Sequence, residues 1–214
     1  MSPALLPGQI VILNGVPRSG KSSIAVAIQA AFDGVWVNLG VDQSMRTTPV
    51  RCQPGIGLRP GAERPDLEPV VETLYSALYD AIAAHSRLGL NVVVDVGHHD
   101  GYSVPRGILP ACARRLGDLP VLFVGVRCPI EEITNRRRTT WGDALAGDGA
   151  MREPVMLWQD EVHRPGIYDL EVDTSKLDPK ECAEAIRQRL NDSSPPSAFQ
   201  RLAALPTPPP SAPG

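Results

Sequence analysis

The residues best suited to chemistry lie in one short segment, Gly15 to Ser22, which reads GVPRSGKS. Its spacing, G-x-x-x-x-G-K-S, lets the backbone curl so that successive N–H groups point at the oxygens of a phosphate chain. Lys21 adds a positive charge for the outer phosphates, and the Ser22 hydroxyl is suited to binding Mg²⁺. The segment therefore predicts a phosphate-binding loop (P-loop), the alternative being a glycine turn before a structural helix.

The sequence on either side of this segment supports the first interpretation. Residues 9–14 (QIVILN) are apolar and β-branched, which predicts a strand, and residues 21–32 carry apolar side chains at helical spacing. A loop between a strand and a helix is the context in which this motif binds a nucleotide. The predicted nucleotide-binding residues are Gly15, Val16, Pro17, Arg18, Ser19, Gly20, Lys21, Ser22 and Ser23.

Two aspartates lie at the ends of predicted strands. Asp95 ends the valine run of residues 91–96 and is expected to bind Mg²⁺ together with Ser22, although it could instead cap a turn. Asp42 ends the apolar run 35–41, where its carboxylate would face an acceptor and take a proton from its hydroxyl. A turn cap or helix cap is the alternative for Asp42.

The rest of the chain alternates apolar runs with helical patterns, which predicts a three-layer α/β fold with a parallel sheet flanked by helices on both faces. An irregular insert that lines the acceptor site is expected at about 43–68, and an arginine-bearing lid at about 129–152. From residue 191 the chain is rich in proline and is predicted to be a disordered tail. Further strands are predicted at 91–96, 121–128 and 168–174, and helices at 69–88, 129–140 and 178–190.

Composition weighs against several classes of partner. The net charge of −3 and the scattered arginines disfavour nucleic acid, and no apolar stretch approaches the roughly 20 residues of a membrane span. Four cysteines without a CxxC pair indicate buried thiols in a reducing compartment, so a cytoplasmic location is expected. His98 and His99 lack partners at metal spacing and are expected on a surface loop. The sequence leaves open whether the chain forms a homo-oligomer.

The motifs that are absent narrow the class of P-loop protein. The chain has neither an N-K-x-D guanine-reading motif nor an LSGGQ-like signature, which weighs against a GTPase switch and a transporter ATPase. A small-molecule kinase uses ATP and Mg²⁺, an acceptor-side base and an arginine that offsets the charge of the transferring group. Asp42 and the cluster Arg136 to Arg138 occupy suitable places, so residues 1–190 are predicted to be a P-loop kinase domain.

The chain also resembles the chloramphenicol phosphotransferases and their relatives among P-loop kinases, from about Gln9 to Leu190. The resemblance is carried by an ordered set of motifs rather than by the loop alone. They are ILNGVPRSGKSSIA at the loop, LGVD with a proline seven residues after its aspartate, GIG at 55–57, VVVD at 92–95, VGVRC at 124–128 and a closing VH…YDLEVDT at 162–174.

The resemblance implies ATP-dependent phosphorylation of a primary alcohol, with Asp42 as general base and Lys21 and Ser22 in the phosphate and Mg²⁺ roles. It implies a lid contact for Arg136. Arg127, in VGVRC, matches the family pattern and is assigned to nucleotide binding, with a structural ion pair as an equally good explanation.

The acceptor is less well defined. The antibiotic kinase carries two adjacent aspartates where this chain has Asp95-Val96, and the following Gly97-His98-His99-Asp100 differs as well. An antibiotic-type alcohol, with chloramphenicol as one candidate, is the first expectation. The rivals are a nucleoside, nucleotide or metabolite kinase of the same fold, and a regulatory protein that binds ATP without transferring its phosphoryl group.

Overall fold

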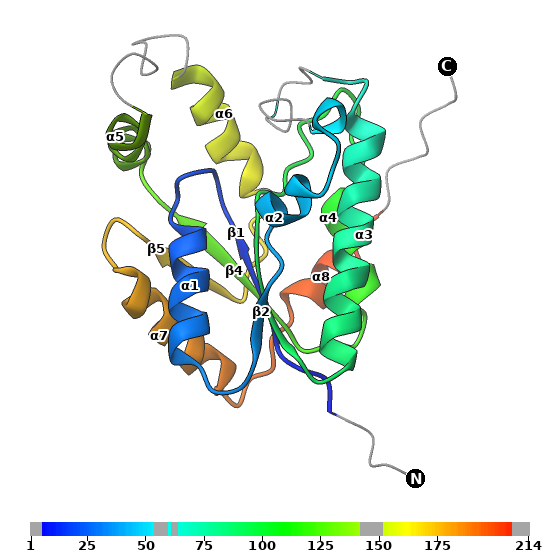
Figure 1. Cartoon of the computed structure of the whole chain (residues 1–214), viewed down its shortest axis with the longest axis vertical. Coiled ribbons are helices and arrows are strands. Elements are labelled where there is room, and N and C mark those ends of the chain that lie inside the picture. The colour runs from blue at the N-terminus through cyan, green and yellow to red at the C-terminus, as the bar shows by residue number, and fades with distance from the viewer. Residues whose placement is uncertain (1–5, 54–59, 61–63, 142–151, 207–214) are drawn as a thin grey trace.

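A computed structural model of the chain describes residues 6–53, 60, 64–141 and 152–206. Figure 1 shows a central sheet with helices on both of its faces and further helices above one edge. Within the described part of the chain, no helix is both long enough and apolar enough to cross a membrane. The three-layer α/β architecture predicted from the sequence is confirmed.

The sheet has five parallel strands in the order β2-β3-β1-β4-β5. Asn14, the last residue of β1, pairs with Val96 on one side and Gly125 on the other, so three strands end almost level. The loops that follow parallel strands therefore gather at one edge, where α/β proteins bind their ligands. The strands are β1 (Ile10–Asn14), β2 (Trp36–Asn38), β3 (Asn91–Val96), β4 (Val121–Arg127) and β5 (Leu170–Asp173).

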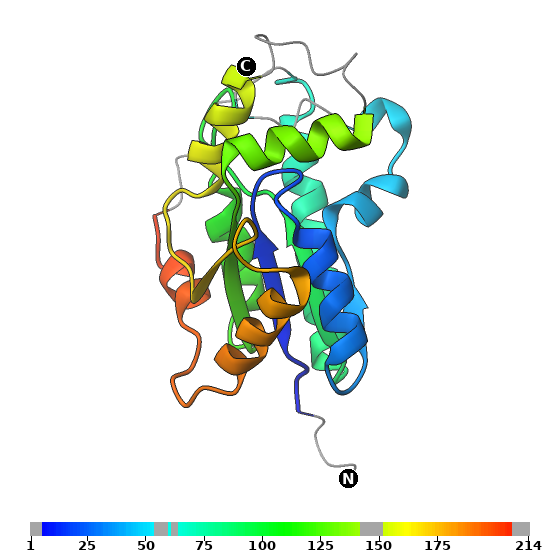
Figure 2. The same cartoon turned by 90° about the vertical axis from the view of Figure 1, so that its left-hand side faces the viewer.

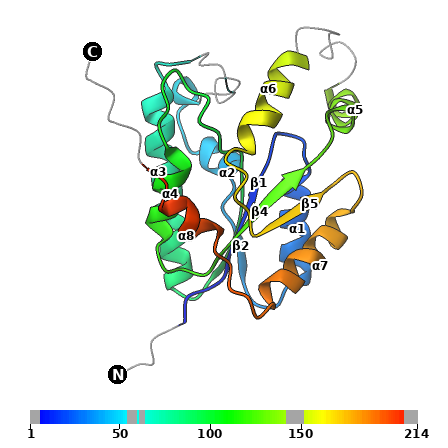
Figure 3. The ribbon, with the colours of Figure 1, turned by 180° about the vertical axis from the view of Figure 1, so that it is seen from behind.

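Both faces of the sheet are covered, which explains why its inner strands β1, β3 and β4 are mostly apolar. In β1, Ile10 and Ile12 face one core, whereas Val11 and Leu13 face the other. The first core lies under α3 (Glu68–Arg87), α4 (Ile108–Leu116) and α8 (Ala198–Ala203), and the second lies under α1 (Lys21–Ala31) and α7 (Pro179–Leu190). Figure 3 shows the two layers from behind.

The remaining helices lie at the carboxyl edge of the sheet. They are α2 (Val41–Arg46), the short 3-10 helix η1 (Val50–Cys52), α5 (Ile130–Trp141) and α6 (Arg152–Val162). In Figure 2, α5 runs across this edge above the loop between β1 and α1. The predicted insert and lid are thus partly helical. Residues 54–59, 61–63 and 142–151, including the GIG motif, lie outside the described residues.

The prediction of a disordered tail from residue 191 is wrong for residues 198–203, which form α8. Ala198, Phe199 and Leu202 are buried against the sheet and α4, and the backbone N–H groups of Ser197 and Ala198 donate to Asp169 Oδ1 at 2.7 and 2.9 Å. The high proline content of the tail as a whole hid this short apolar helix. Residues 207–214 lie outside the described residues.

Candidate active site

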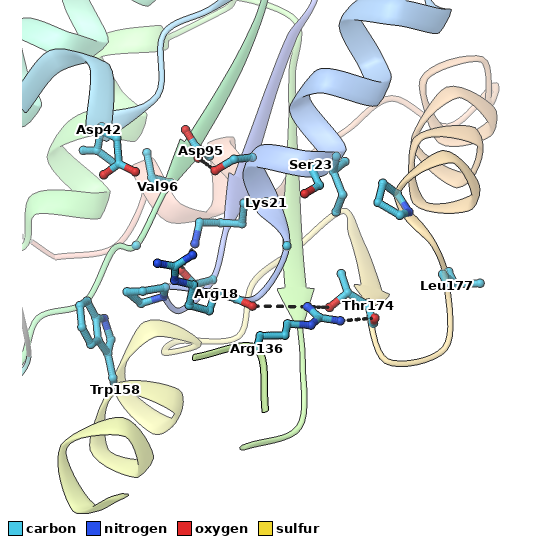
Figure 4. Close-up of a pocket in the computed structure, with 18 of the residues that line it drawn as sticks. Arg18, Lys21, Ser23, Asp42, Asp95, Val96, Arg136, Trp158, Thr174 and Leu177 are labelled. Atoms are coloured by element: carbon cyan, nitrogen blue, oxygen red, sulfur yellow. Dashed lines mark hydrogen bonds between the residues drawn. The ribbon is translucent and has the colours of Figure 1, made fainter. Parts of the chain in front are cut away.

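A cavity of about 820 Å³ lies at the carboxyl edge of the sheet, above the loop that joins β1 to α1. Its walls come from this loop, α2, α3, the start of the loop after β3, α5, α6 and the loop after β5. In Figure 4, Asp42, Val96 and Trp158 lie on one side of Lys21, and Thr174 and Leu177 lie on the other. The cavity therefore has two halves that meet at the P-loop.

The P-loop has the geometry of an anion cradle. Gly20, just before α1, has a φ of 98°, a left-handed conformation that glycine adopts without strain. A Cβ at Gly15 would lie 2.6 Å from the Val126 carbonyl oxygen, so only glycine fits there. No side chain caps the first turn of α1, which leaves its positive dipole end directed at the cavity.

Lys21 lies at the floor of the cavity and folds back over its own loop. Its Nζ donates to the carbonyl oxygens of Gly15 and Val16, each at 2.8 Å. Burial lowers the pKa of the Lys21 ammonium from 10.5 to about 8, although the negative charges of Asp95 and Asp42 act in the opposite direction. A phosphate group would supply the compensating charge that this partly desolvated ammonium lacks.

Ser22 and Asp95 meet in the way the sequence predicts. The Ser22 hydroxyl donates to Asp95 Oδ2 at 2.6 Å, and the Asp95 side chain is largely buried. The chain passes very close to this carboxylate, because a Cβ at Gly40 would lie 1.7 Å from Asp95 Oδ1. The pair presents oxygen ligands of the kind that Mg²⁺ prefers.

Asp42 lies in the cavity, but its predicted position at the end of a strand is wrong. Strand β2 ends at Asn38, and Asp42 is the second residue of α2. The chain turns at Gly40, whose N–H donates to Asn38 Oδ1 at 3.0 Å, before the helix begins. The β-branched Val41 resembled a strand residue but opens a helix, where the acidic Asp42 suits the positive dipole end.

Arg136 reaches the cavity from α5 and braces the P-loop. Its Nη1 donates to the Arg18 carbonyl oxygen at 3.3 Å and to Thr174 Oγ1 at 3.2 Å, and its Nη2 donates to the Thr174 carbonyl oxygen at 2.8 Å. Its Nε donates to Glu132 at 2.9 Å. Thr174 in turn donates to the Ser19 carbonyl oxygen at 2.8 Å. The guanidinium therefore fixes the loop on the side of α5 and β5.

Arg127 does not line the cavity. Its Nε donates to Glu171 Oε1 at 2.8 Å, and its guanidinium lies 5.8 Å from the centre of the Tyr168 ring. Within the loop itself, Val16 and Ser19 are buried behind the lining residues. The structure thus brings Gly15, Pro17, Arg18, Gly20, Lys21, Ser22, Ser23, Asp42, Asp95 and Arg136 together around one cavity.

Several lining residues were not predicted from the sequence. On the side of Asp42 they include Met45 of α2, Tyr75 of α3 and Trp158 of α6. Near α1 they include Thr174 and the segment 177–179, which precedes α7. The capping box formed by Asp178 and Glu181 marks the start of α7, so the sequence carried a signal for that segment.

His98 and His99 are buried, and the prediction of a surface loop is wrong. The backbone N–H of His98 donates to Asn14 Oδ1 at 2.8 Å, and its Nε2 lies 2.7 Å from the Tyr79 hydroxyl. Burial lowers the pKa of His98 to about 3, and His99 contributes to this decrease. The other polar atom of Asn14, its Nδ2, donates to the Val162 carbonyl oxygen at 2.8 Å, so one residue joins β1, the loop after β3 and α6.

The fold is shared with solved structures, one of which is a small-molecule kinase. The Mycobacterium tuberculosis APS kinase CysC in complex with AMPPNP and APS superimposes with a TM-score of 0.55 at 16% identity, covering 87% of this chain and 99% of that one. The Deinococcus radiodurans tunicamycin resistance protein gives a TM-score of 0.57 at 19% identity, covering 86% of this chain and 96% of that one.

Two comparisons of sequence agree with the fold. A curated relative from Mycobacterium tuberculosis strain H37Rv, named "Putative O-phosphotransferase Rv2636", is 27% identical in an alignment that covers 91% of this chain and 88% of the relative. The family model described as chloramphenicol phosphotransferase-like protein matches residues 8–191. The protein is thus a small-molecule kinase, and the chain belongs to the chloramphenicol phosphotransferase-like family.

Proposed function

We propose that the protein transfers the γ-phosphoryl group of ATP to the hydroxyl of an antibiotic-type small molecule, as a chloramphenicol 3-O-phosphotransferase does. The observation that carries the proposal is that one cavity joins the P-loop lysine and the Ser22–Asp95 pair to the carboxylate of Asp42. A phosphate cradle and a candidate general base must face the same space if a phosphoryl group is to pass between two bound molecules.

The residues around the P-loop fit ATP and Mg²⁺. Lys21 offers an ammonium that hydrogen-bonds to carbonyl groups of the loop, and the start of α1 offers backbone N–H groups. Ser22 and Asp95 would hold Mg²⁺, directly or through water, and the ion would offset charge on the phosphates. The half of the cavity lined by Thr174 and Leu177 is the space left for the nucleoside.

Asp42 would act on the acceptor. Its carboxylate would accept the hydroxyl proton as the acceptor oxygen bonds to the γ-phosphorus and the bridging oxygen departs with ADP. Lys21 and Arg136 would offset the negative charge that spreads over the transferring oxygens. Val41, Met45, Tyr75 and Trp158 line the same half of the cavity, and these apolar and aromatic side chains suit an acceptor with an apolar body.

The decisive experiment measures ATP consumption by the purified protein with Mg²⁺, with and without a panel of hydroxylated antibiotics and metabolites that includes chloramphenicol. We expect one alcohol to stimulate turnover and to gain one phosphoryl group by mass spectrometry. The same alcohol with its reactive hydroxyl blocked by methylation serves as the control and should give no stimulation.

The other outcomes distinguish the rival functions. Stimulation by nucleosides, sugars or phosphorylated metabolites alone would contradict the antibiotic-type acceptor while leaving phosphoryl transfer in place. Tight ATP binding without stimulation by any alcohol would favour a regulatory ATP-binding protein.

The cytoplasmic location stays a prediction from the sequence.

A further inference from the structure

Asn14 is a fully buried polar residue at the end of an otherwise apolar strand. The residues of β1 read IVILN, and all of them are buried. An apolar side chain would fit this position by pattern, and a buried amide is costly unless its donor and acceptor groups are hydrogen-bonded. The partners of the Asn14 amide therefore indicate what it does.

The Asn14 amide forms hydrogen bonds to three other segments of the chain. Its Oδ1 accepts from the backbone N–H of His98 at 2.8 Å. Its Nδ2 donates to the Val162 carbonyl oxygen at 2.8 Å and to the Tyr168 hydroxyl at 2.9 Å. A backbone N–H only donates and a carbonyl oxygen only accepts, so these partners fix the orientation of the amide.

The bond to Val162 positions one wall of the cavity. Val162 is the last residue of α6, and Trp158, which lines the cavity, lies one helical turn earlier on the same face of that helix. Both side chains pack with Val16 of the P-loop in one small apolar cluster. The α6 helix has a second attachment, from Gln159 to the Cys128 carbonyl oxygen. Loss of the bond to β1 should therefore shift this wall rather than release the helix.

The bond to His98 positions a second wall. His98 directly follows Gly97, which lines the cavity. The His98 ring lies against Tyr75 of α3, with 4.4 Å between the ring centres and an angle of 31° between the ring planes. Tyr75 also lines the cavity. One buried amide thus joins two aromatic walls, Tyr75 and Trp158, to the end of β1.

The P-loop itself is attached to the fold through other groups. The Gly15 N–H donates to the Val96 carbonyl oxygen at 3.2 Å, and Arg136 and Thr174 hold carbonyl oxygens further along the loop. Removing the Asn14 side chain leaves all of these bonds in place. The amide is therefore placed to act on the aromatic walls and not on the phosphate cradle.

We propose that Asn14 is a positioning residue for the acceptor, holding Tyr75 and Trp158 where they align the acceptor hydroxyl with the γ-phosphorus. Phosphoryl transfer needs the attacking oxygen close to phosphorus and in line with the leaving group, and a misplacement of about 1 Å costs a factor of about 100 in rate. Asn14 acts in this role through the two walls and contacts neither substrate. The inference rests on the proposed function.

The test compares two asparagines that join the same two segments at opposite ends of the sheet. Asn14→Ala removes the amide at the cavity end. Asn91→Ala is the matched control, because Asn91, the first residue of β3, accepts from the backbone N–H of Gln9, just before β1, at 2.9 Å. Asn14→Ser retains a hydroxyl and is the milder variant, which is used alone if Asn14→Ala does not fold. Thermal unfolding identifies a temperature at which every variant is folded.

Steady-state rates are measured with ATP, Mg²⁺ and the alcohol that the acceptor panel identifies. For Asn14→Ala we expect KM for the alcohol to rise about tenfold and kcat to fall about tenfold, while the dissociation constant for ATP stays within about twofold. Asn14→Ser should show the same division with smaller losses. Asn91→Ala should match the unmodified protein in all of these quantities.

Hydrogen exchange reports on the attachment of the two walls without any acceptor. Peptides covering residues 97–100 and 158–164 should exchange faster in Asn14→Ala than in the unmodified protein, because His98 and the last turn of α6 each lose a partner. Asn91→Ala should leave the exchange of these peptides unchanged.

Three results would overturn the inference while leaving the proposed function in place. Unchanged exchange in Asn14→Ala would mean that the amide does not hold the walls. Faster exchange with unchanged kcat and KM would mean that Asn14 serves only the fold. Equal losses of ATP affinity and of kcat/KM for the alcohol would assign Asn14 to the phosphate cradle. If the unmodified protein phosphorylates no alcohol of the panel, the proposed function fails and this inference with it.

Discussion

The two halves of the cavity differ in the groups that line them, which are mostly backbone in one half and side chains in the other. Around the proposed phosphate site the chain uses mostly backbone: the loop between β1 and α1, the start of α1, and loop carbonyls fixed by Thr174 and Arg136. The half near Asp42, which we call the acceptor half after its proposed role, instead uses side chains from separate elements, among them Met45 of α2, Tyr75 of α3 and Trp158 of α6.

This difference distinguishes the half of the cavity that many kinases can share from the half that we expect to be specific to one acceptor. A backbone cradle binds any nucleotide phosphate chain and needs only a few fixed residue types, so many kinases can share it. A wall of side chains changes with every substitution on α2, α3 or α6, so we expect it to determine which acceptor binds. Variants in the two halves should therefore separate nucleotide binding from transfer.

The largest effect is expected where both halves meet, at Lys21. Lys21→Ala should reduce ATP affinity and phosphoryl transfer together, with kcat/KM falling about 1,000-fold, because the ammonium serves the bound ATP and the transferring group alike. Nucleotide calorimetry and initial rates measure the two effects. Unchanged affinity and rate would contradict the assignment of the P-loop as the phosphate site.

A variant in the acceptor half should reduce phosphoryl transfer without reducing ATP affinity, whereas Lys21→Ala reduces both. Asp42→Asn should lower kcat by about 10²–10³ while the dissociation constant for ATP stays within twofold, because a general base contacts only the acceptor hydroxyl. Asp118→Asn, in an exposed turn at the opposite end of the sheet, is the control. Equal loss of ATP binding and transfer in Asp42→Asn would show that Asp42 serves the cradle instead.

The phosphate half could be predicted because its determinants are local. Gly15, Gly20, Lys21 and Ser22 lie within eight residues, and Asp95 ends an unmistakable buried strand that pairs directly with β1. The position of Asp42 was harder, because Gly40, where the chain turns, lies against the carboxylate of Asp95, which is far along the chain and leaves no room for a Cβ. Local pattern alone extended the strand by three residues.

The acceptor half could not be predicted because its residues meet only through the tertiary fold. Tyr75 lies in α3 and Trp158 lies in α6, with β3, α4, β4 and α5 between them in the chain, and neither lies in a motif. His98 was assigned to a surface loop because its partners, Asn14 and Tyr79, come from two other elements. In the same way, α8 was missed because its burial depends on the sheet face it covers.

A smaller effect is expected from loosening the acceptor half without touching the cavity. Buried Glu68 accepts hydrogen bonds from Ser103 and Arg106, which hold the loop after β3 against α3. Glu68→Ala removes the acceptor of the Ser103 hydrogen bonds and the nearer carboxylate partner of Arg106, and it should lower the free energy of unfolding by about 3 kcal/mol in urea titration.

Glu72 provides the matched control, because it also pairs with Arg106, at 3.4 Å, but its side chain is about half exposed. Glu72→Ala should cost less than about 1 kcal/mol. At a temperature where both variants are folded, ATP affinity should stay within twofold of the unmodified protein. Equal costs for the two substitutions, or a loss of ATP affinity in Glu68→Ala, would mean that the halves are not independent.

The smallest effect is the pH dependence of ATP binding in the phosphate half. Since the pKa of Lys21 is lowered to about 8, the ammonium is mostly charged at pH 7.5 and mostly neutral at pH 9. Phosphate oxygens favour the charged form, so binding takes up a proton and ATP affinity should fall about tenfold over this interval. Calorimetry in buffers of different ionisation enthalpy measures the ATP affinity and the number of protons taken up on binding. Lys21→Ala should lose the proton uptake. A flat affinity between pH 7.5 and 9 would mean that Lys21 does not contact the phosphates as a titrating group. Asp42→Asn removes one of the negative charges that raise the pKa of Lys21, so the fall in affinity should persist and move to lower pH.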